Sequence, residues 1–370
     1  MSRTSYPVYR TFALWRFICA LIIVAYHLAH FKPETAGSLP VFELLNPLLD
    51  LFFIVSGYLI FQHYGDRVRD WPSYKAYIVR RIVRIYPLHL VTFAFFVAIG
   101  MAVHFGIVNS ASGAARYDWS QIPANILLVQ GWGFSNDLSF NYVSWSLSAE
   151  WFCYLLLPAI VYAYVRGGIA GIALFLLAFV ALLEIMIAAR IIPDKAWWWA
   201  KEWGAWRAFA DFTMGALILK LVNVSRWKLR SHWPSWIVLA IAVTAMFCSL
   251  HFYLCWALLS FALYLSALAE NNNSAATEWI APALPVLNAS FGVYLWHPVV
   301  ITLMNSLLWN WFVAHTGVIG LYPWLVIVGL TSVAVAFVSM YFVEARMTKL
   351  LQGWLVGPPA PAPAGAPARA

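Results

Sequence analysis

The chain has 370 residues, of which 63% are apolar and only 10% are charged, and its mean hydropathy is +0.75. A soluble globular domain carries about 25% charged residues, so this composition excludes a soluble multidomain protein. The net charge of +8 does not indicate nucleic acid binding, because the Lys and Arg residues lie in short segments between apolar runs. We therefore predict an all-α, polytopic membrane protein and expect no nucleic acid among its partners.

Apolar runs long enough to span, or nearly span, a bilayer occur about ten times. They lie near 12–31, 46–63, 85–108, 146–165, 168–190, 205–222, 235–252, 254–269, 285–308 and 321–343. The boundary between the seventh and eighth runs is the least distinct. We interpret the first run as a retained helix and not as a signal peptide, because no small-residue cleavage site follows it cleanly. The prediction is a membrane domain of about ten transmembrane helices over 1–350, followed by a disordered Pro/Ala-rich cytoplasmic tail over 351–370.

Lys and Arg are distributed unevenly between the two sets of predicted loops. With the N-terminus inside, fifteen of them fall on the inner side, and the outer loops hold six: Lys32, Arg116, Arg190, Lys195, Lys201 and Arg207. Cytoplasmic loops carry an excess of Lys and Arg, so both termini are predicted to be cytoplasmic. The largest outer loop is predicted at about 109–145.

The four cysteines lie in apolar segments and form neither a CxxC pair nor a Cys/His cluster: Cys19, Cys153, Cys248 and Cys255. Neither a disulfide framework nor a metal site is predicted, and all four fit the role of small buried hydrophobic residues. A nucleophilic thiol at Cys19 stays open as an alternative, because Cys19 shares a predicted helix with two ionisable residues.

These two residues are Arg16 and His27, within an otherwise apolar sequence. Eleven residues at about 100° each bring them onto one helix face, roughly 16 Å apart along the axis. A guanidinium suits the phosphates of a nucleotide-bearing donor such as an acyl-CoA, and an imidazole suits a general base for a hydroxyl near neutral pH. The alternative is that Arg16 snorkels to lipid headgroups and His27 caps a neighbouring helix.

Two carboxylates are expected near the outer ends of later helices. Asp50 opens the second span, where it either orients His27 like the third member of a catalytic triad or caps the helix start. Glu150 either hydrogen-bonds an acceptor sugar, pairs with an arginine, or completes a capping box with a preceding serine. Ser56 and Gly57 are expected to permit close helix packing.

Basic residues precede the third predicted span. Arg81 and Arg84 are three apart and therefore adjacent on a helix face. With Arg16 they predict a cytoplasmic anion site for CoA phosphates, and the alternative is a topogenic cluster that binds anionic lipid. His297, which precedes Pro298, either serves the site or has a structural role at a helix kink.

Taken in order, these segments resemble acyltransferase family 3, the membrane-bound O-acyltransferases of bacterial polysaccharides, lipopolysaccharide and small glycosides. The stretches that carry the resemblance are Arg16 through His27, Asp50-Leu-Phe-Phe-Ile-Val-Ser-Gly-Tyr, Arg80-Arg81-Ile-Val-Arg84-Ile-Tyr-Pro, Trp145-Ser-Leu-Ser-Ala-Glu150, Tyr294-Leu-Trp-His297-Pro and Phe342-Val-Glu344. The resemblance implies a ten-helix bundle, acyl-CoA as a cytoplasmic donor and an acceptor at the outer side. It also implies that Arg16 and His27 are essential and that Arg81 and Arg84 support them. Ala345 follows Glu344 where the family often has proline, which weakens any role carried over to Glu344.

The function predicted is a membrane O-acyltransferase of the bacterial inner membrane. It would move an acyl group, expected to be acetyl, from acyl-CoA to a hydroxyl of a cell-surface glycan, glycolipid or glycoside. The expected partners are acyl-CoA (acetyl-CoA as donor), a glycan or glycolipid acceptor and membrane lipid, with no metal. The predicted catalytic residues are His27, Asp50 and Glu150, and the predicted donor-binding residues are Arg16, Arg81 and Arg84. The alternative is a secondary transporter or lipid-linked glycan flippase, although the sequence shows no convincing internal repeat.

Overall fold

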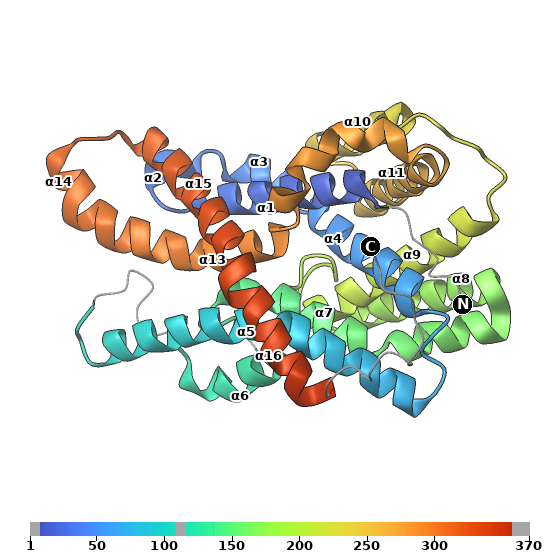
Figure 1. Cartoon of the computed structure of the whole chain (residues 1–370). Helices are drawn as coiled ribbons and strands as arrows, with labels where there is room; N and C mark the ends of the chain where they lie inside the picture. Colours follow the sequence, from blue (N-terminus) through green and yellow to red (C-terminus); the bar gives the residue numbers. More distant parts are fainter. Residues whose placement is uncertain (1–7, 109–115, 136, 357–370) are drawn as a thin grey trace, which may run out of the picture.

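The computed structural model describes residues 8–108, 116–135 and 137–356, and all regular structure in these ranges is helical (Figure 1). Within them, seven helical segments are long and apolar enough to cross a membrane. They are Arg10–Ala29 (α1), Leu39–Tyr64 (containing α4, Leu48–Tyr64), Trp71–His104 (α5), Leu157–Ala188 (α8), Phe252–Asn272 (α11), Ser290–Thr316 (containing α13, Ser290–Ile301) and Leu321–Leu351 (containing α15, Leu321–Ser339). The prediction of an all-α chain is thus confirmed for the described ranges, and the seven segments agree with a helical membrane protein. The number ten and the placement of both termini in the cytoplasm stay predictions.

The other predicted runs also contain helices, but these are short or carry several charged residues. They are α7 (Trp145–Leu155), α9 (Gly204–Val224) and α10 (Trp233–Phe247). The run predicted at 146–165 is shared by α7 and the first part of α8. The chain then breaks its helical geometry at Gly168, where φ is +59°, and continues as the run predicted at 168–190. The least distinct boundary, near 252, is a real turn at 248–251 between α10 and α11.

Shorter helical pieces connect the long ones. They are α2 (Pro33–Ala36), α3 (Leu39–Leu44), η2 (Trp119–Gln121), α6 (Ile122–Leu127), η3 (Tyr142–Ser144), η4 (Ser274–Ala283), α12 (Leu284–Leu287), η5 (Thr302–Val313), α14 (Ala314–Thr316) and η6 (Met340–Glu344).

Helix α5 begins well before the span predicted at 85–108. Asp70 is its N-cap, and its carboxylate accepts a hydrogen bond from the backbone N–H of Ser73 at 2.9 Å, while Pro72 occupies the first turn. The basic residues Arg81 and Arg84 therefore lie inside a 34-residue helix, next to each other on one face as predicted. Only the start of the helix was predicted too late, because the span was placed by its apolar residues and the start signal at Asp70 and Pro72 was not used.

The C-terminal boundary also differs from the prediction. Helix α16 (Ala345–Val356) packs against α5, which Figure 1 shows as the last helix lying across it. The tail predicted from 351 therefore cannot begin before 357, and the residues beyond that point lie outside the described residues. Residues 351–356 include no proline that would end the helix, and the helix continues through them.

The closest packing in the bundle joins α4 and α9, where two glycines allow the backbones to approach. A Cβ built on Gly57 would lie 2.1 Å from the carbonyl oxygen of Phe212, and one on Gly215 would lie 2.0 Å from that of Ile54. Small residues are the usual means of such close approach between membrane helices. The packing role predicted for Gly57 is confirmed.

We expect Gly215→Ala to destabilise the protein by about 1–3 kcal/mol, because the added methyl group meets backbone atoms that cannot move aside. Thermal unfolding of the purified protein in detergent measures the effect. Gly37→Ala is the matched control, since a Cβ there meets nothing within 4 Å. Equal unfolding temperatures for the two variants would contradict this account of the α4–α9 contact.

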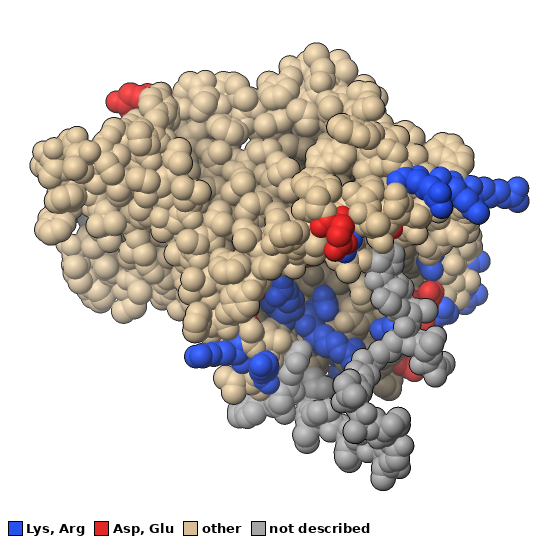
Figure 2. Space-filling model, turned by 45° about the horizontal axis from the view of Figure 1, so that its top comes forward, with Lys and Arg blue, Asp and Glu red and all other residues tan. Residues whose placement is uncertain are grey.

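The face in Figure 2 has a broad surface almost without charged residues, and Lys and Arg gather at one side of it.

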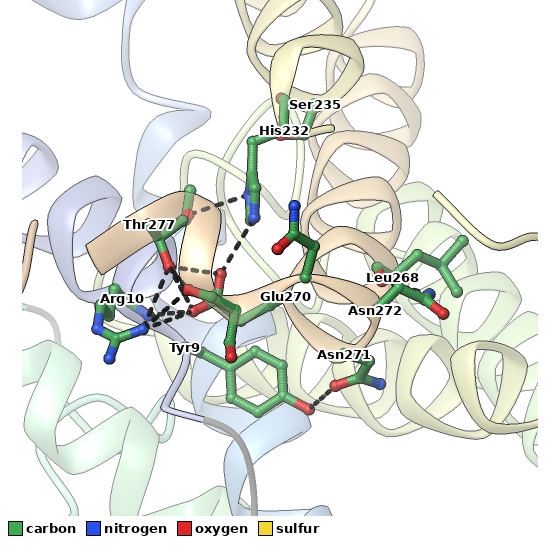
Figure 3. A network of polar contacts seen from close by, with 12 residues as sticks. Tyr9, Arg10, His232, Ser235, Leu268, Glu270, Asn271, Asn272 and Thr277 are labelled. Atoms are coloured by element: carbon green, nitrogen blue, oxygen red, sulfur yellow. Dashed lines mark hydrogen bonds and ion pairs between the residues drawn. The ribbon is translucent and has the colours of Figure 1, made fainter. Parts of the chain in front are cut away.

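At the N-terminal end of α1 a buried polar network links several helices of the bundle (Figure 3). Glu270, which is 1% exposed, accepts a hydrogen bond from Thr277 at 2.9 Å and lies 3.3 Å from Nε2 of His232 and 3.9 Å from Arg10. The network connects α1 to α11, to η4 and to the segment before α10, and so fixes the start of α1.

Candidate active site

Three adjoining spaces follow α1 from one end to the other. The Arg16 cavity, of about 470 Å³, lies at the start of α1 and is lined by Tyr9, Phe12, Arg16, Gln62, Arg84 and Phe291, among others. The His27 cavity, of about 590 Å³, lies at the other end and is lined by Cys19, Tyr26, His27, Tyr142, Trp145 and Tyr294, among others. The neck, a space of about 50 Å³, lies between them. It shares Arg16 and Phe291 with the first cavity and Leu49 and Tyr294 with the second.

Arg16 lines both the Arg16 cavity and the neck. Its guanidinium carbon lies 5.8 Å from the ring centre of Phe52, and its Nε is buried without a hydrogen-bond partner among the described residues. A buried guanidinium donor with no acceptor is costly, and an anion entering the cavity would satisfy it.

His27 is half-buried and lines the larger cavity, on the helix face predicted from its spacing to Arg16. Rings surround it: the ring centres of Tyr26 and Tyr142 are each 5.0 Å away, and that of His297 is 5.2 Å away. Burial raises the pKa of Tyr142 to about 12, so its hydroxyl stays protonated beside the imidazole at neutral pH. The structure therefore brings Arg16 and His27 to adjoining spaces along α1.

Asp50 does not orient His27. It is fully buried, and both carboxylate oxygens are bound by Arg207: Nε donates to Oδ1 at 2.6 Å and Nη2 donates to Oδ2 at 2.9 Å. It is also not the helix cap, because Pro47 holds that position in α4. Asp50 therefore contacts Arg207 of α9 and not His27, and it lies in the first turn of α4 and not at its cap, because the helix begins at Leu48.

Glu150 lies in the neck and binds neighbouring side chains. Its Oε1 accepts hydrogen bonds from Ser56 at 3.0 Å and from Tyr154 at 2.6 Å. The capping-box alternative was wrong, because α7 begins at Trp145 and Ser144, its N-cap residue, makes no side-chain cap. Ser56 was expected only to permit packing, yet it contributes a polar contact to the neck.

Arg81 lies apart from the three spaces, in a cage of tyrosine rings. Its guanidinium carbon is 5.2 Å from the ring centre of Tyr64, 5.9 Å from that of Tyr77 and 5.6 Å from that of Tyr154. Because Tyr154 also donates to Glu150, Arg81 is connected to the neck through one intervening side chain. This geometry supports a positioning role for Arg81 more directly than a contact with phosphate.

Arg84 does line the Arg16 cavity. It is about half exposed, and its Nη1 donates to Oε2 of Glu344 at 3.1 Å, while its guanidinium carbon lies 5.3 Å from the ring centre of Phe291. Of the three predicted donor-binding arginines, the structure thus brings Arg16 and Arg84 to one cavity and leaves Arg81 outside it. Glu344, which the sequence left without a role, is the counter-ion of Arg84.

Arg207 and Asp211 were missed by sequence reasoning, which placed Arg207 in an outer loop. Arg207 is 2% exposed on α9, lines the His27 cavity and also donates to the carbonyl oxygens of Trp198 and Asn46. Asp211, fully buried one turn later, accepts a hydrogen bond from the indole N–H of Trp256 at 2.6 Å. A usable signal was present, since an arginine and an aspartate four residues apart inside an apolar run are neighbours on one helix face.

Apolar helices long enough to cross a membrane, with an arginine and a histidine at adjoining internal cavities, define the class as multi-pass helical membrane proteins. The acyltransferase 3 family, described as an acyltransferase domain, matches residues 11–342, and the chain belongs to this family. It is also 31% identical over 150 residues to acyltransferase MdmB of Streptomyces mycarofaciens, an alignment that covers 39% of this chain and 36% of that protein. No solved structure matches the chain. The predicted family membership is confirmed, and the alignment to the Streptomyces protein spans only about a third of that relative's length.

Proposed function

We propose that the protein transfers an acyl group, in the first instance acetyl, from cytoplasmic acyl-CoA to a hydroxyl of a cell-surface glycan, glycolipid or glycoside in the bacterial inner membrane. The single observation that supports this most is the placement of Arg16 and His27. Each lines one of two cavities, and a narrow neck lined by Arg16 adjoins both. With the predicted topology of about ten spans, the Arg16 cavity opens towards the cytoplasm and the His27 cavity towards the outer side.

In this proposal Arg16 and Arg84 bind CoA phosphates, and the pantetheine arm reaches through the neck. A guanidinium pairs well with phosphate. When CoA binds, one of its phosphates would replace Glu344 as the counter-ion of Arg84. Besides the polar side chains of Arg16, Glu150 and two serines, the neck is lined by Phe52, Phe53 and other apolar side chains, which suit an acyl thioester. Glu150 accepts hydrogen bonds from the hydroxyl groups of Ser56 and Tyr154 and so holds these side chains in position at the neck.

The transfer step follows from the chemistry of a thioester. The acceptor hydroxyl oxygen attacks the carbonyl carbon while His27 takes the hydroxyl proton, and the carbon–sulfur bond breaks. The proton then passes to the CoA thiolate, which leaves an ester and free CoA thiol. In the alternative route a ring nitrogen of His27 first accepts the acyl group with release of CoA, and the acceptor hydroxyl then takes it.

The test uses purified full-length protein in lipid nanodiscs with [14C]acetyl-CoA and a total glycolipid and glycan extract of the source cells. We expect label to enter an ester-linked product, and rapid quenching without acceptor to show labelled protein only if the acyl-histidine route operates. A transporter or flippase would leave acetyl-CoA intact in every arm. That outcome would reject the enzyme proposal.

Arg16→Ala should raise the Kd for acetyl-CoA by about tenfold or more, since a charge-assisted hydrogen bond contributes roughly 1.5–3 kcal/mol. Equilibrium binding of labelled acetyl-CoA to the purified protein measures this. Arg166→Ala is the matched control, because Arg166 is exposed, has the same charge and lines none of the three spaces. An unchanged Kd in the Arg16 variant would remove Arg16 from the donor site.

A further inference from the structure

His27 lacks the partner that usually orients a histidine base. Such a base commonly donates one ring N–H to a carboxylate or a carbonyl oxygen, which fixes its tautomer and its direction. The carboxylate expected here, Asp50, is bound at both oxygens by Arg207. Among the described residues His27 makes no side-chain hydrogen bond, and the rings of Tyr26, Tyr142 and His297 lie around it.

The ring that lies most nearly parallel to His27 belongs to His297. The two planes make an angle of 24°, whereas the tyrosine rings meet His27 edge-on at 65° and 68°. His297 is 0% exposed and does not line the His27 cavity, so His27 lies between the cavity and a fully buried ring. Stacking of this kind restrains the tilt of an imidazole without making a hydrogen bond to it.

His297 is itself held in place. Its Nδ1 lies 3.2 Å from the carbonyl oxygen of Val293, one turn earlier in α13. A carbonyl can only accept, so Nδ1 carries the proton and Nε2 of the neutral ring carries a lone pair. That Nε2 is buried and has no hydrogen-bond partner among the described residues. Buried polar atoms without partners are rare, and they are frequent at functional sites.

We propose that His297 is a positioning residue which stacks against His27 and directs its ring nitrogen into the cavity, in the place that a carboxylate occupies in other histidine-base sites. The proposal rests on the proposed function, in which His27 takes the acceptor proton. Its expected signature is a loss of turnover at unchanged donor affinity, because His297 touches neither cavity. A planar apolar ring at 297 should preserve most of the effect.

His89 gives a matched control. It is also 0% exposed, its Nε2 lies 2.7 Å from the carbonyl oxygen of Asn125, and its Nδ1 is buried without a partner among the described residues. Its ring stacks on Phe93, with centres 5.9 Å apart and planes at 14°. The two histidines share the same local arrangement, but His89 stacks on a phenylalanine and lines none of the three spaces.

The experiment measures kcat and KM for acetyl-CoA, by release of CoA thiol, with full-length protein in nanodiscs. We expect His297→Ala to lower kcat by about 10–100-fold with unchanged KM, as misplacement of a catalytic group by an ångström can do. We expect His297→Phe to lower kcat by less than about fivefold, and His89→Phe to have the kcat of the parent protein. The unfolding temperature of each variant identifies any that fail to fold, and His297→Phe keeps the test valid if His297→Ala does.

The outcomes separate the two proposals. The positioning role is overturned if His297→Ala has the kcat of the parent protein. It is also overturned if His297→Phe and His297→Ala lose kcat equally, because a ring nitrogen of His297 would then be required. Loss of turnover in His89→Phe as large as in His297→Ala would also overturn it. If the parent protein itself turns over no acetyl-CoA, or His27→Ala is as active as the parent, the proposed function fails instead.

Discussion

His27→Ala should reduce acyl transfer by about 10²–10⁴-fold, the contribution expected of a positioned general base, and to the background level if His27 carries the acyl group. The variant should still fold, because His27 is half-buried at a cavity wall and no described hydrogen bond depends on it. It should also bind acetyl-CoA like the parent protein, since the predicted phosphate contacts lie in the other cavity. Labelled transfer, donor binding and thermal unfolding measure the three properties on the same preparation.

His315→Ala is the control for this experiment. His315 is exposed on α14 and lines none of the three spaces, so the same chemical change there should leave transfer unaltered. Near-parent transfer by the His27 variant would defeat the proposed mechanism. In that case Cys19, whose side chain also lines the His27 cavity, would become the next candidate nucleophile.

The second large effect is expected on stability, from the buried pair of Asp50 and Arg207. Removing one partner leaves the other charged and buried, and this costs about 3–5 kcal/mol in other proteins. Arg207→Ala would leave two carboxylates, Asp50 and Asp211, in the same buried region of α4 and α9. We therefore expect Arg207→Ala to lower the free energy of unfolding by about 3–5 kcal/mol, measured by reversible unfolding in mixed micelles.

Two further variants give this prediction its control. Arg69→Ala removes a partner of Asp66 at 3.6 Å, but the two side chains are 52% and 67% exposed, so the loss should stay within about 1 kcal/mol. The double replacement Asp50→Leu with Arg207→Met removes both charges together and should be more stable than Arg207→Ala alone. If Arg207→Ala and Arg69→Ala have the same free energy of unfolding, the buried pair does not have the importance assigned to it.

Much of the fold could be predicted because membrane helices are recognisable from their local composition. The ten apolar runs each correspond to helical structure, and the turn between α10 and α11 lies where the pattern was least distinct. Helix ends were harder, since charged residues do not exclude a helix that continues into water. Helix α5 extends fourteen residues before its predicted start for this reason, with Asp70 and Pro72 as the relevant start signals.

The candidate site was predictable only as far as it lies on one helix. Arg16 and His27 are related by helical periodicity, which the sequence contains, and the structure places both at adjoining cavities. Arg207 on α9, which binds Asp50, and Ser56 on α4, which binds Glu150, come from other helices, and no rule of spacing relates them. Only Tyr154, four residues after Glu150 on α7, follows helical spacing. The stacking of His297 on His27 likewise depends on how α13 packs beside α1, a tertiary contact that one sequence does not encode locally.

The narrowness of the neck also bears on ion leakage. If the two cavities open to opposite sides of the membrane, as the distribution of Lys and Arg predicts, the acyl group must cross between aqueous compartments that hold different proton concentrations and a voltage. A space of about 50 Å³, bounded by Phe52, Phe53, Leu147 and Leu295 among others, holds no more than a few water molecules, and a thioester arm that fills it would displace them. The bound arm would therefore keep the membrane electrically tight while the enzyme turns over.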